Sequence, residues 1–216
     1  MTATPRIAVL GAGHTGPVIA RVAVEAGYPV RIAASGDPAD IELITQILAP
    51  GAVAGWAADA VAESDLVVLA IPLHRFVTLD PSLVAGKLVV DTMNYWPPVD
   101  GVEGMFEDRG YGSSEIVARR LSRSTVVKTL NHIGYHELDV DRRPEGAAGR
   151  RALGVAGDDP VAVDTVAGVI DRIGYDPVRL PGLRTGRLLE PGGPVFGVAL
   201  RRNAFQLAVS ATARQE

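Results

Sequence analysis

The pattern that decides the fold is the stretch IAVLGAGHTG, residues 7–16. Its first four residues are all apolar, which is typical of a parallel strand that is covered by helices on both faces. They lead into the motif G-x-G-x-x-G, and a predicted helix follows over residues 17–26. In this motif Gly11 allows a tight turn, Gly13 lets a pyrophosphate approach the backbone, and Gly16 lets the helix pack against the strand. The stretch therefore predicts a Rossmann-type dinucleotide-binding unit.

Similar apolar runs alternate with predicted helices along the rest of the chain, which indicates an α/β fold with a doubly wound parallel sheet. Further strands are expected at residues 30–33, 66–71, 88–90 and 125–127, and further helices at 38–48, 57–63 and 113–121. We expect residues 1–141 to form the NADP-binding Rossmann domain. An exposed loop at 142–149 then leads to residues 150–216, a C-terminal extension of the same sheet with strands at 152–156 and 177–180. Its helices are expected at 160–173 and 198–212.

The end of the second predicted strand favours NADP(H) over NAD(H). An enzyme that uses NAD usually has Asp or Glu there to hold the ribose 2′-hydroxyl. This chain has Ala33-Ala34-Ser35-Gly36, and Asp37 comes late enough to cap the next helix. The hydroxyl of Ser35 and the amide of Gly36 could hold a 2′-phosphate, although no arginine stands at this position.

Polar residues follow several other strands, where ligands of open α/β sheets bind. All four histidines (His14, His74, His132 and His136) fall in such loops or in the glycine loop, which suggests a lined pocket. We expect no metal site, because the segment between His132 and His136, Ile133-Gly134-Tyr135, contains a poor helix former and no acidic residue. Asp91 fits two roles equally well, a buried acid at a strand end or a catalytic base.

Composition excludes several classes of protein. There is no cysteine, so disulfides, thiolate nucleophiles and thiolate metal sites are ruled out. The formal net charge of −4 argues against nucleic-acid binding. The longest apolar run, residues 66–73, is too short to cross a membrane, and the first residues do not resemble a signal peptide. We therefore expect a cytoplasmic protein.

The sequence resembles the coenzyme F420-dependent NADP reductases, and it is also similar to the cytosolic oxidoreductase domain of six-transmembrane ferric reductases. The resemblance covers nearly the whole chain. It rests on the glycine loop, Ser35, Ile71-Pro72, the segments Val90–Asn94 and Val127–Asn131, and Arg187–Glu190.

The resemblance implies hydride transfer between two stacked rings, with no catalytic side chain, in a homodimer. Residues implied to hold NADP(H) are Gly11, Gly13, His14, Thr15, Gly16, Ser35, Gly36, Ile71, Pro72 and Leu73, with His74 beside them. Residues implied to lie near the second ring are Met93, Asn94, Asn131 and Arg187.

The sequence leaves the hydride acceptor open. It departs from the family at Gly36, where many members have arginine, and at the Pro-Gly-Gly-Pro break over residues 191–194. The acceptor could be coenzyme F420, a flavin, or a small carbonyl or imine compound. A β-hydroxyacid dehydrogenase ranks low, because too little sequence remains for its large helical domain. A non-catalytic NADP-binding sensor is the alternative from another class.

Overall fold

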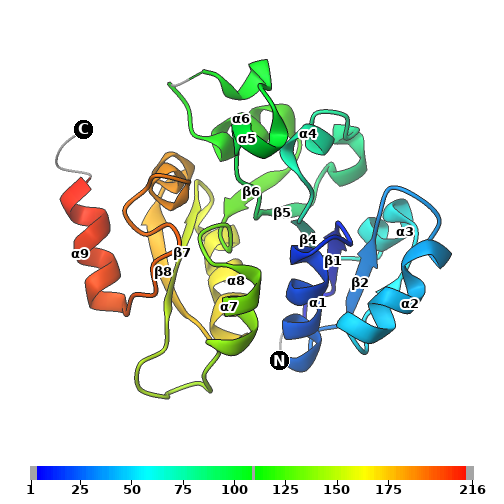
Figure 1. The fold of residues 1–216 in the computed structure, drawn as a ribbon, viewed down its shortest axis with the longest axis horizontal. Coiled ribbons are helices and arrows are strands. Elements are labelled where there is room, and N and C mark those ends of the chain that lie inside the picture. Colours follow the sequence, from blue (N-terminus) through cyan, green and yellow to red (C-terminus); the bar gives the residue numbers. More distant parts are fainter. Residues whose placement is uncertain (1–3, 109, 213–216) are drawn as a thin grey trace.

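The computed structural model describes residues 4–108 and 110–212. Its strands form one eight-stranded sheet in the order β3-β2-β1-β4-β5-β6-β7-β8 (Figure 1). The strands are β1 (Ile7–Leu10), β2 (Val30–Ala33), β3 (Val53–Ala54), β4 (Leu66–Leu69), β5 (Leu88–Asp91), β6 (Thr125–Lys128), β7 (Ala152–Gly157) and β8 (Asp176–Pro181). The sheet is mostly parallel, so the predicted Rossmann-like α/β fold is confirmed.

Helices connect the strands as predicted in outline. The α-helices are α1 (Thr15–Glu25), α2 (Ala39–Leu48), α3 (Ala57–Ala62), α4 (Leu73–Phe76), α5 (Pro97–Asp100), α6 (Ser113–Arg120), α7 (Tyr135–Val140), α8 (Pro160–Arg172) and α9 (Arg202–Thr212). Three 3₁₀-helices complete the set: η1 (Pro81–Val84), η2 (Gly104–Phe106) and η3 (Leu183–Leu189). No helix in the described part of the chain is long and apolar enough to cross a membrane.

The two faces of the sheet carry separate hydrophobic cores. Helices α1, α7 and α8 cover one face, where Ile19, Leu138 and Ile170 pack on the strands. Helices α3, α4 and α6 cover the other, with Phe76 and Val117 buried against the sheet. Alternate residues of each strand point to the two faces, which explains why the strands are apolar at every position. Helix α9 packs on β7 and β8.

The C-terminal part extends the same sheet, but in the opposite direction. Strand β7 is antiparallel to β6, and β8 is parallel to β7. Only two pairs join β6 to β7, Val127 with Gly157 and Lys128 with Ala156. Because these are the last residues of β6, most of β7 runs beyond the carboxyl end of the parallel strands. Strand β7 thus forms a side wall at the edge where ligands of such sheets bind.

Candidate cofactor-binding site

Two glycines of the predicted motif are required by the fold itself. Gly11 has a φ of +122° and donates its N–H to the carbonyl of Ala33 at 2.8 Å. A Cβ atom at Gly11 would lie 2.2 Å from the carbonyl oxygen of Ala70, and one at Gly16 would lie 1.8 Å from that of Gly11. Any side chain at either position would therefore force the turn apart.

Gly13 has no such internal reason to be glycine. A Cβ atom placed there would meet no heavy atom within 4 Å, and its φ lies outside the left-handed region. The next residues begin α1, whose N-terminus has no side-chain cap and no acidic residue in its first turn. An exposed glycine beside uncapped helix amides leaves the room and the donors that a pyrophosphate needs. This geometry fits the predicted role of Gly13, with His14 and Thr15 at the start of the helix.

The loop after β2 is open but bears no cation. Ser35 and Gly36 are exposed, and Asp37 accepts a hydrogen bond from the N–H of Ala39 at 2.9 Å, so it caps α2 as predicted. A Cβ atom at Gly36 would lie 3.5 Å from a carboxylate oxygen of Asp40. A 2′-phosphate could still be bound here through the Ser35 hydroxyl and backbone amides, but Asp40 would oppose it.

The loop after β4 presents mainly backbone atoms to the predicted cofactor site. Pro72 is exposed, and Ile71 lies beside the glycine turn, its Cγ2 3.2 Å from the position of a Gly11 Cβ atom. Leu73 is 1% exposed and belongs to the hydrophobic core, so its side chain is occupied by packing. His74 instead approaches Asp100, with Nδ1 3.5 Å from a carboxylate oxygen.

A buried ion pair fixes the loop that follows β5. The carboxylate of Asp91 accepts a hydrogen bond from the N–H of Met93 at 2.9 Å, and Lys128 Nζ donates to the carbonyl of Met93 at 3.2 Å. Lys128 and Asp91 are each fully buried, with Nζ and carboxylate oxygen 3.7 Å apart. The structure thus favours the role of a buried strand-end acid for Asp91, since both carboxylate oxygens are hydrogen-bonded; its second partner is the hydroxyl of Ser114 at 2.5 Å.

The same network reaches the C-terminal extension. Lys128 Nζ also donates to the hydroxyl of Ser113 at 3.1 Å and lies 3.8 Å from the carboxylate of Glu190. Glu190 in turn accepts hydrogen bonds from the N–H and the hydroxyl of Ser113. Sequence reasoning missed this network, although a lysine inside an otherwise apolar strand is a signal that it needs buried partners.

Two asparagines join the ends of β5 and β6. The side chain of Asn94 donates to the carbonyl of Asn131 at 2.7 Å, and that of Asn131 donates to the Asn94 side chain at 2.9 Å and to the carbonyl of Leu189 at 2.6 Å. The residue before Asn131, Leu130, has a φ of +62°, which is strained for a branched side chain. Such strain is often held at functional sites, and here it helps to set the turn that carries Asn131.

Arg187 lies on η3, far from this pair in sequence, and its side chain packs at the start of α6. Its side chain is half-buried and packs on Gly112, where an added Cβ atom would come within 2.5 Å of its Cγ. The structure therefore brings η3 to the N-terminus of α6, above the ends of β5 and β6. The role of Arg187 near a second ring stays a prediction.

The four histidines do not line one pocket. The His14 ring stacks on the Tyr135 ring with centroids 5.7 Å apart, and the centroid of the His136 ring lies 4.1 Å from that of Tyr135. His132 is buried: its Nε2 accepts the N–H of Gly154 at 3.1 Å, and its Nδ1 faces the Asn131 side chain. Burial, aided by the charges of Arg151 and Lys128, lowers the pKa of His132 to about 3. His132 precedes α7, so it shares no helix face with His136, and no group of three possible metal ligands occurs among the described residues.

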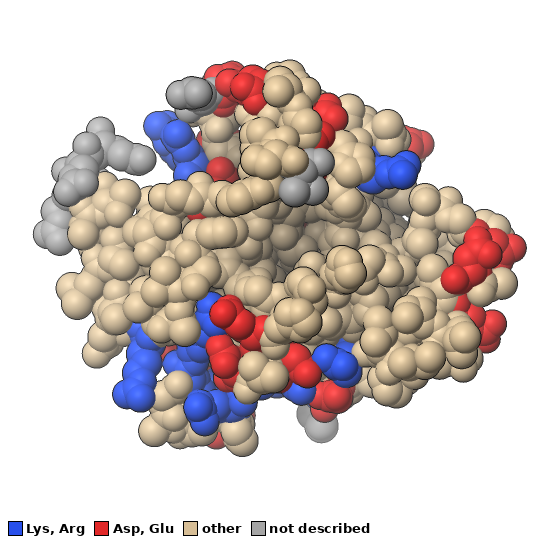
Figure 2. Space-filling model, in the orientation of Figure 1, with Lys and Arg blue, Asp and Glu red and all other residues tan. Residues whose placement is uncertain are grey.

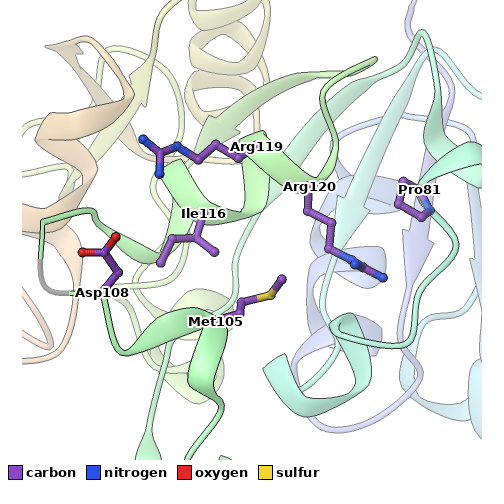
Figure 3. A pocket seen from close by; sticks show the side chains of 6 residues that line it. All are labelled: Pro81, Met105, Asp108, Ile116, Arg119 and Arg120. Atoms are coloured by element: carbon purple, nitrogen blue, oxygen red, sulfur yellow. The ribbon is translucent and has the colours of Figure 1, made fainter.

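A cavity lies away from the residues described above. It has a volume of about 440 Å³ and opens between η1, η2 and α6 (Figure 3). Arg120 donates from this region to the carbonyls of Val77 and Leu79, while Arg119 covers the ring of Tyr111 at 3.3 Å. None of the residues lining it belongs to the predicted site.

Comparison with known protein families finds a match in the N-terminal part of the chain. Residues 6–95 match the family model described as NADP oxidoreductase, coenzyme F420-dependent. The resemblance predicted from the sequence is thus confirmed over these residues. The matched residues include the glycine motif and the strand-end residues Met93 and Asn94.

A curated protein also matches part of the chain. The chain is 46% identical over 75 residues to the protein YjhV of Escherichia coli (strain K12), which is 33% of this chain and 55% of that protein. It therefore spans only about half the length of that curated relative.

Solved structures match over nearly the whole chain. A hypothetical protein, SMa0349 from Sinorhizobium meliloti, is 28% identical with a TM-score of 0.77, covering 93% of this chain and 97% of that one. A protein of Arthrobacter sp. FB24, provisionally named an F420-dependent NADP-reductase, is 24% identical with a TM-score of 0.73, covering 92% and 100%. These likenesses show that the fold is shared over more than nine-tenths of the chain.

Proposed function

We propose that this protein binds NADP(H) at the glycine turn and transfers hydride between its nicotinamide and a flat ring acceptor, either deazaflavin (coenzyme F420) or flavin. The observation that carries the proposal is Gly13, whose glycine character the protein's own packing does not require. The family match over residues 6–95 supports the same cofactor. The activity assigned to the whole chain is our proposal.

Gly11 and Gly16 would form the turn, and the other predicted residues would contact the cofactor in three groups. Backbone amides of Gly13, His14 and Thr15 would hold the pyrophosphate, and Ser35 and Gly36 the 2′-phosphate. The backbone of Ile71, Pro72 and Leu73, with His74 beside them, would follow the cofactor along the strand ends. The nicotinamide end would be bounded by Met93, Asn94, Asn131 and Arg187.

The proposed hydride transfer requires no acid, base or nucleophile from the protein. When bound, the nicotinamide itself would supply or accept the hydride. Asp91 and Lys128 are committed to each other and to the Met93 backbone, and His132 is buried and hydrogen-bonded on both ring nitrogens. The role left to the chain is to hold two reactants in register, which can lower a barrier by about 7–11 kcal/mol.

A turnover assay tests the proposal. The protein is mixed with NADPH and either oxidised F420 or a free flavin, and bleaching of the acceptor is followed in the presence and absence of a chelator. Reduction of either ring, unaffected by the chelator, supports hydride transfer between rings. If NADPH binds but neither acceptor is reduced, a small carbonyl or imine substrate is tested next. If NADPH is never oxidised, a sensor becomes the better interpretation.

A homodimer and a cytoplasmic location complete the proposal. Both are expectations from the sequence, and the homodimer comes from the family resemblance. Sedimentation velocity measures the first directly, and fractionation of cells that express the protein measures the second.

A further inference from the structure

Helix α2 exposes its apolar side chains and buries a polar one. Leu43 is 70% exposed, Ile44 40%, Ile47 62% and Leu48 37%, whereas Thr45 is 1% exposed. These four apolar residues, here called the α2 stripe, are spaced three and four apart, so their side chains lie on one side of the helix. A surface helix normally turns such a stripe toward the core. In this molecule the buried side of α2 is the one that bears Thr45.

The lobe that carries the stripe is acidic. Residues 32–74 contain no Lys or Arg but six acidic residues, Asp37, Asp40, Glu42, Asp59, Glu63 and Asp65. Glu63 and Asp65 pair with Arg31 and Arg6, while no ion pair among the described residues involves the other four. Figure 2 shows Asp and Glu, and no Lys or Arg, at the right-hand end of the molecule, where Figure 1 places α2 and α3. Asp40 precedes Leu43 and Ile44 by three and four residues, so its carboxylate lies at the N-terminal end of the stripe.

We propose that the α2 stripe is a docking surface for a basic amphipathic helix of a partner protein. The apolar stripe would bury the partner's apolar face, as in other helix-recognition surfaces. Lys or Arg residues that flank that face would meet Asp40, Glu42 and the neighbouring carboxylates. Opposite charges at the rim of such an interface speed association and select the partner.

The same charges argue against two other occupants. A second copy docked through α2 would bring two acidic lobes together with no free cation in residues 32–74 to pair with them, and like charges across an interface are costly. Helices that lie on membranes carry Lys and Arg on their polar face, the opposite of what surrounds this stripe.

Fluorescence anisotropy with three labelled synthetic helices tests the proposal. One has a leucine stripe flanked by lysines, the second has the same stripe flanked by glutamates, and the third is a scrambled version of the first. We expect only the first to bind. The Leu43→Ser/Ile47→Ser variant should weaken its binding at least about tenfold. The Asp40→Asn/Glu42→Gln variant should weaken it severalfold at low salt and little at high salt.

The matched control is Leu207→Ser on α9, where an equally exposed leucine (69%) lies outside the stripe. This variant should bind the lysine-flanked helix as the unchanged protein does. Circular dichroism checks that every variant is folded. We expect all of them to fold, because the substituted side chains are exposed. Equal binding of the glutamate-flanked or scrambled helix, or unchanged binding by the stripe variant, would overturn the proposal. So would sedimentation that shows a dimer dissociated by the stripe variant, or stripe-dependent binding to anionic lipid vesicles.

Discussion

Gly13 is the residue at which ligand binding and folding separate most cleanly. We predict that Gly13→Val abolishes dinucleotide binding and leaves the fold intact. A Cβ atom there meets nothing of the protein's own, but the added side chain would stand where a pyrophosphate must approach the backbone. Calorimetry with NADPH should show affinity reduced by at least about a hundredfold, or no binding.

A contrasting variant makes this result interpretable. Gly16→Ala should destabilise the protein, because its Cβ atom would lie 1.8 Å from the Gly11 carbonyl oxygen. If Gly13→Val binds NADPH normally while remaining folded by circular dichroism, the glycine loop is only a turn.

The hydroxyl of Ser35 should contribute to the choice of cofactor. We predict that the protein prefers NADPH to NADH, and that Ser35→Ala weakens NADPH while NADH is nearly unaffected. A hydrogen bond to a charged phosphate is worth about 1.5–3 kcal/mol, or roughly tenfold or more in affinity. Titration of both cofactors measures this. Tighter binding of NADH by the unchanged protein would contradict it.

Gly36 offers the converse experiment. Its Cβ position has only ordinary contact with Asp40, so Gly36→Arg fits the loop and would bring a guanidinium toward a 2′-phosphate. We expect NADPH affinity to rise about tenfold, and further when combined with Asp40→Asn, which removes the competing carboxylate. NADH affinity is the internal control. A parallel rise for NADH would show that the arginine does not act on the 2′-phosphate.

Between elements, the Asp91–Lys128 pair joins β5, β6, the Met93 loop and α6. We predict that Lys128→Met destabilises the protein by about 3–5 kcal/mol, because it leaves a carboxylate buried without its cation. Asp91→Asn in addition to Lys128→Met should recover part of the loss. Urea unfolding of both single variants and the double variant gives the coupling. If the losses simply add, the two side chains do not act as a pair.

The regular elements were the most predictable part of the structure. Helices α1, α3 and α8 and most strands follow from apolar runs and turn residues within one or two positions. Strand β3 was missed because two residues, Val53 and Ala54, give no periodicity to detect. The helices α4 and α5 were missed for the same reason, since four residues carry too little pattern, and α7 was also missed.

Over the whole molecule, local patterns could not predict how distant segments meet. An apolar run such as that of β7 is compatible with either strand direction, so the sequence could not predict its antiparallel pairing with β6. The family resemblance placed Met93, Asn94 and Asn131 near one another, and in the structure hydrogen bonds join the two asparagines at the ends of β5 and β6. Glu190 and Ser113, 77 residues apart, meet only through the tertiary fold.

The junction between β6 and β7 should make global stability sensitive to acid. Burial holds the pKa of His132 at about 3, against an ordinary value of 6.5, so below pH 6.5 the unfolded chain takes up a proton that the folded chain refuses. The contribution of neutral His132 to the free energy of unfolding is therefore fully present above pH 6.5, and it is lost as the pH falls from about 6.5 toward 3. At pH 5 the loss from this group is about 2 kcal/mol relative to pH 7.5.

Urea unfolding at the two pH values tests this with His132→Gln, which retains an oxygen acceptor for the Gly154 N–H. We expect this variant to be less stable than the unchanged protein at pH 7.5 but less sensitive to acid. His136→Gln, at an exposed histidine, should keep the full sensitivity, and an unchanged pH dependence in His132→Gln would place its origin elsewhere.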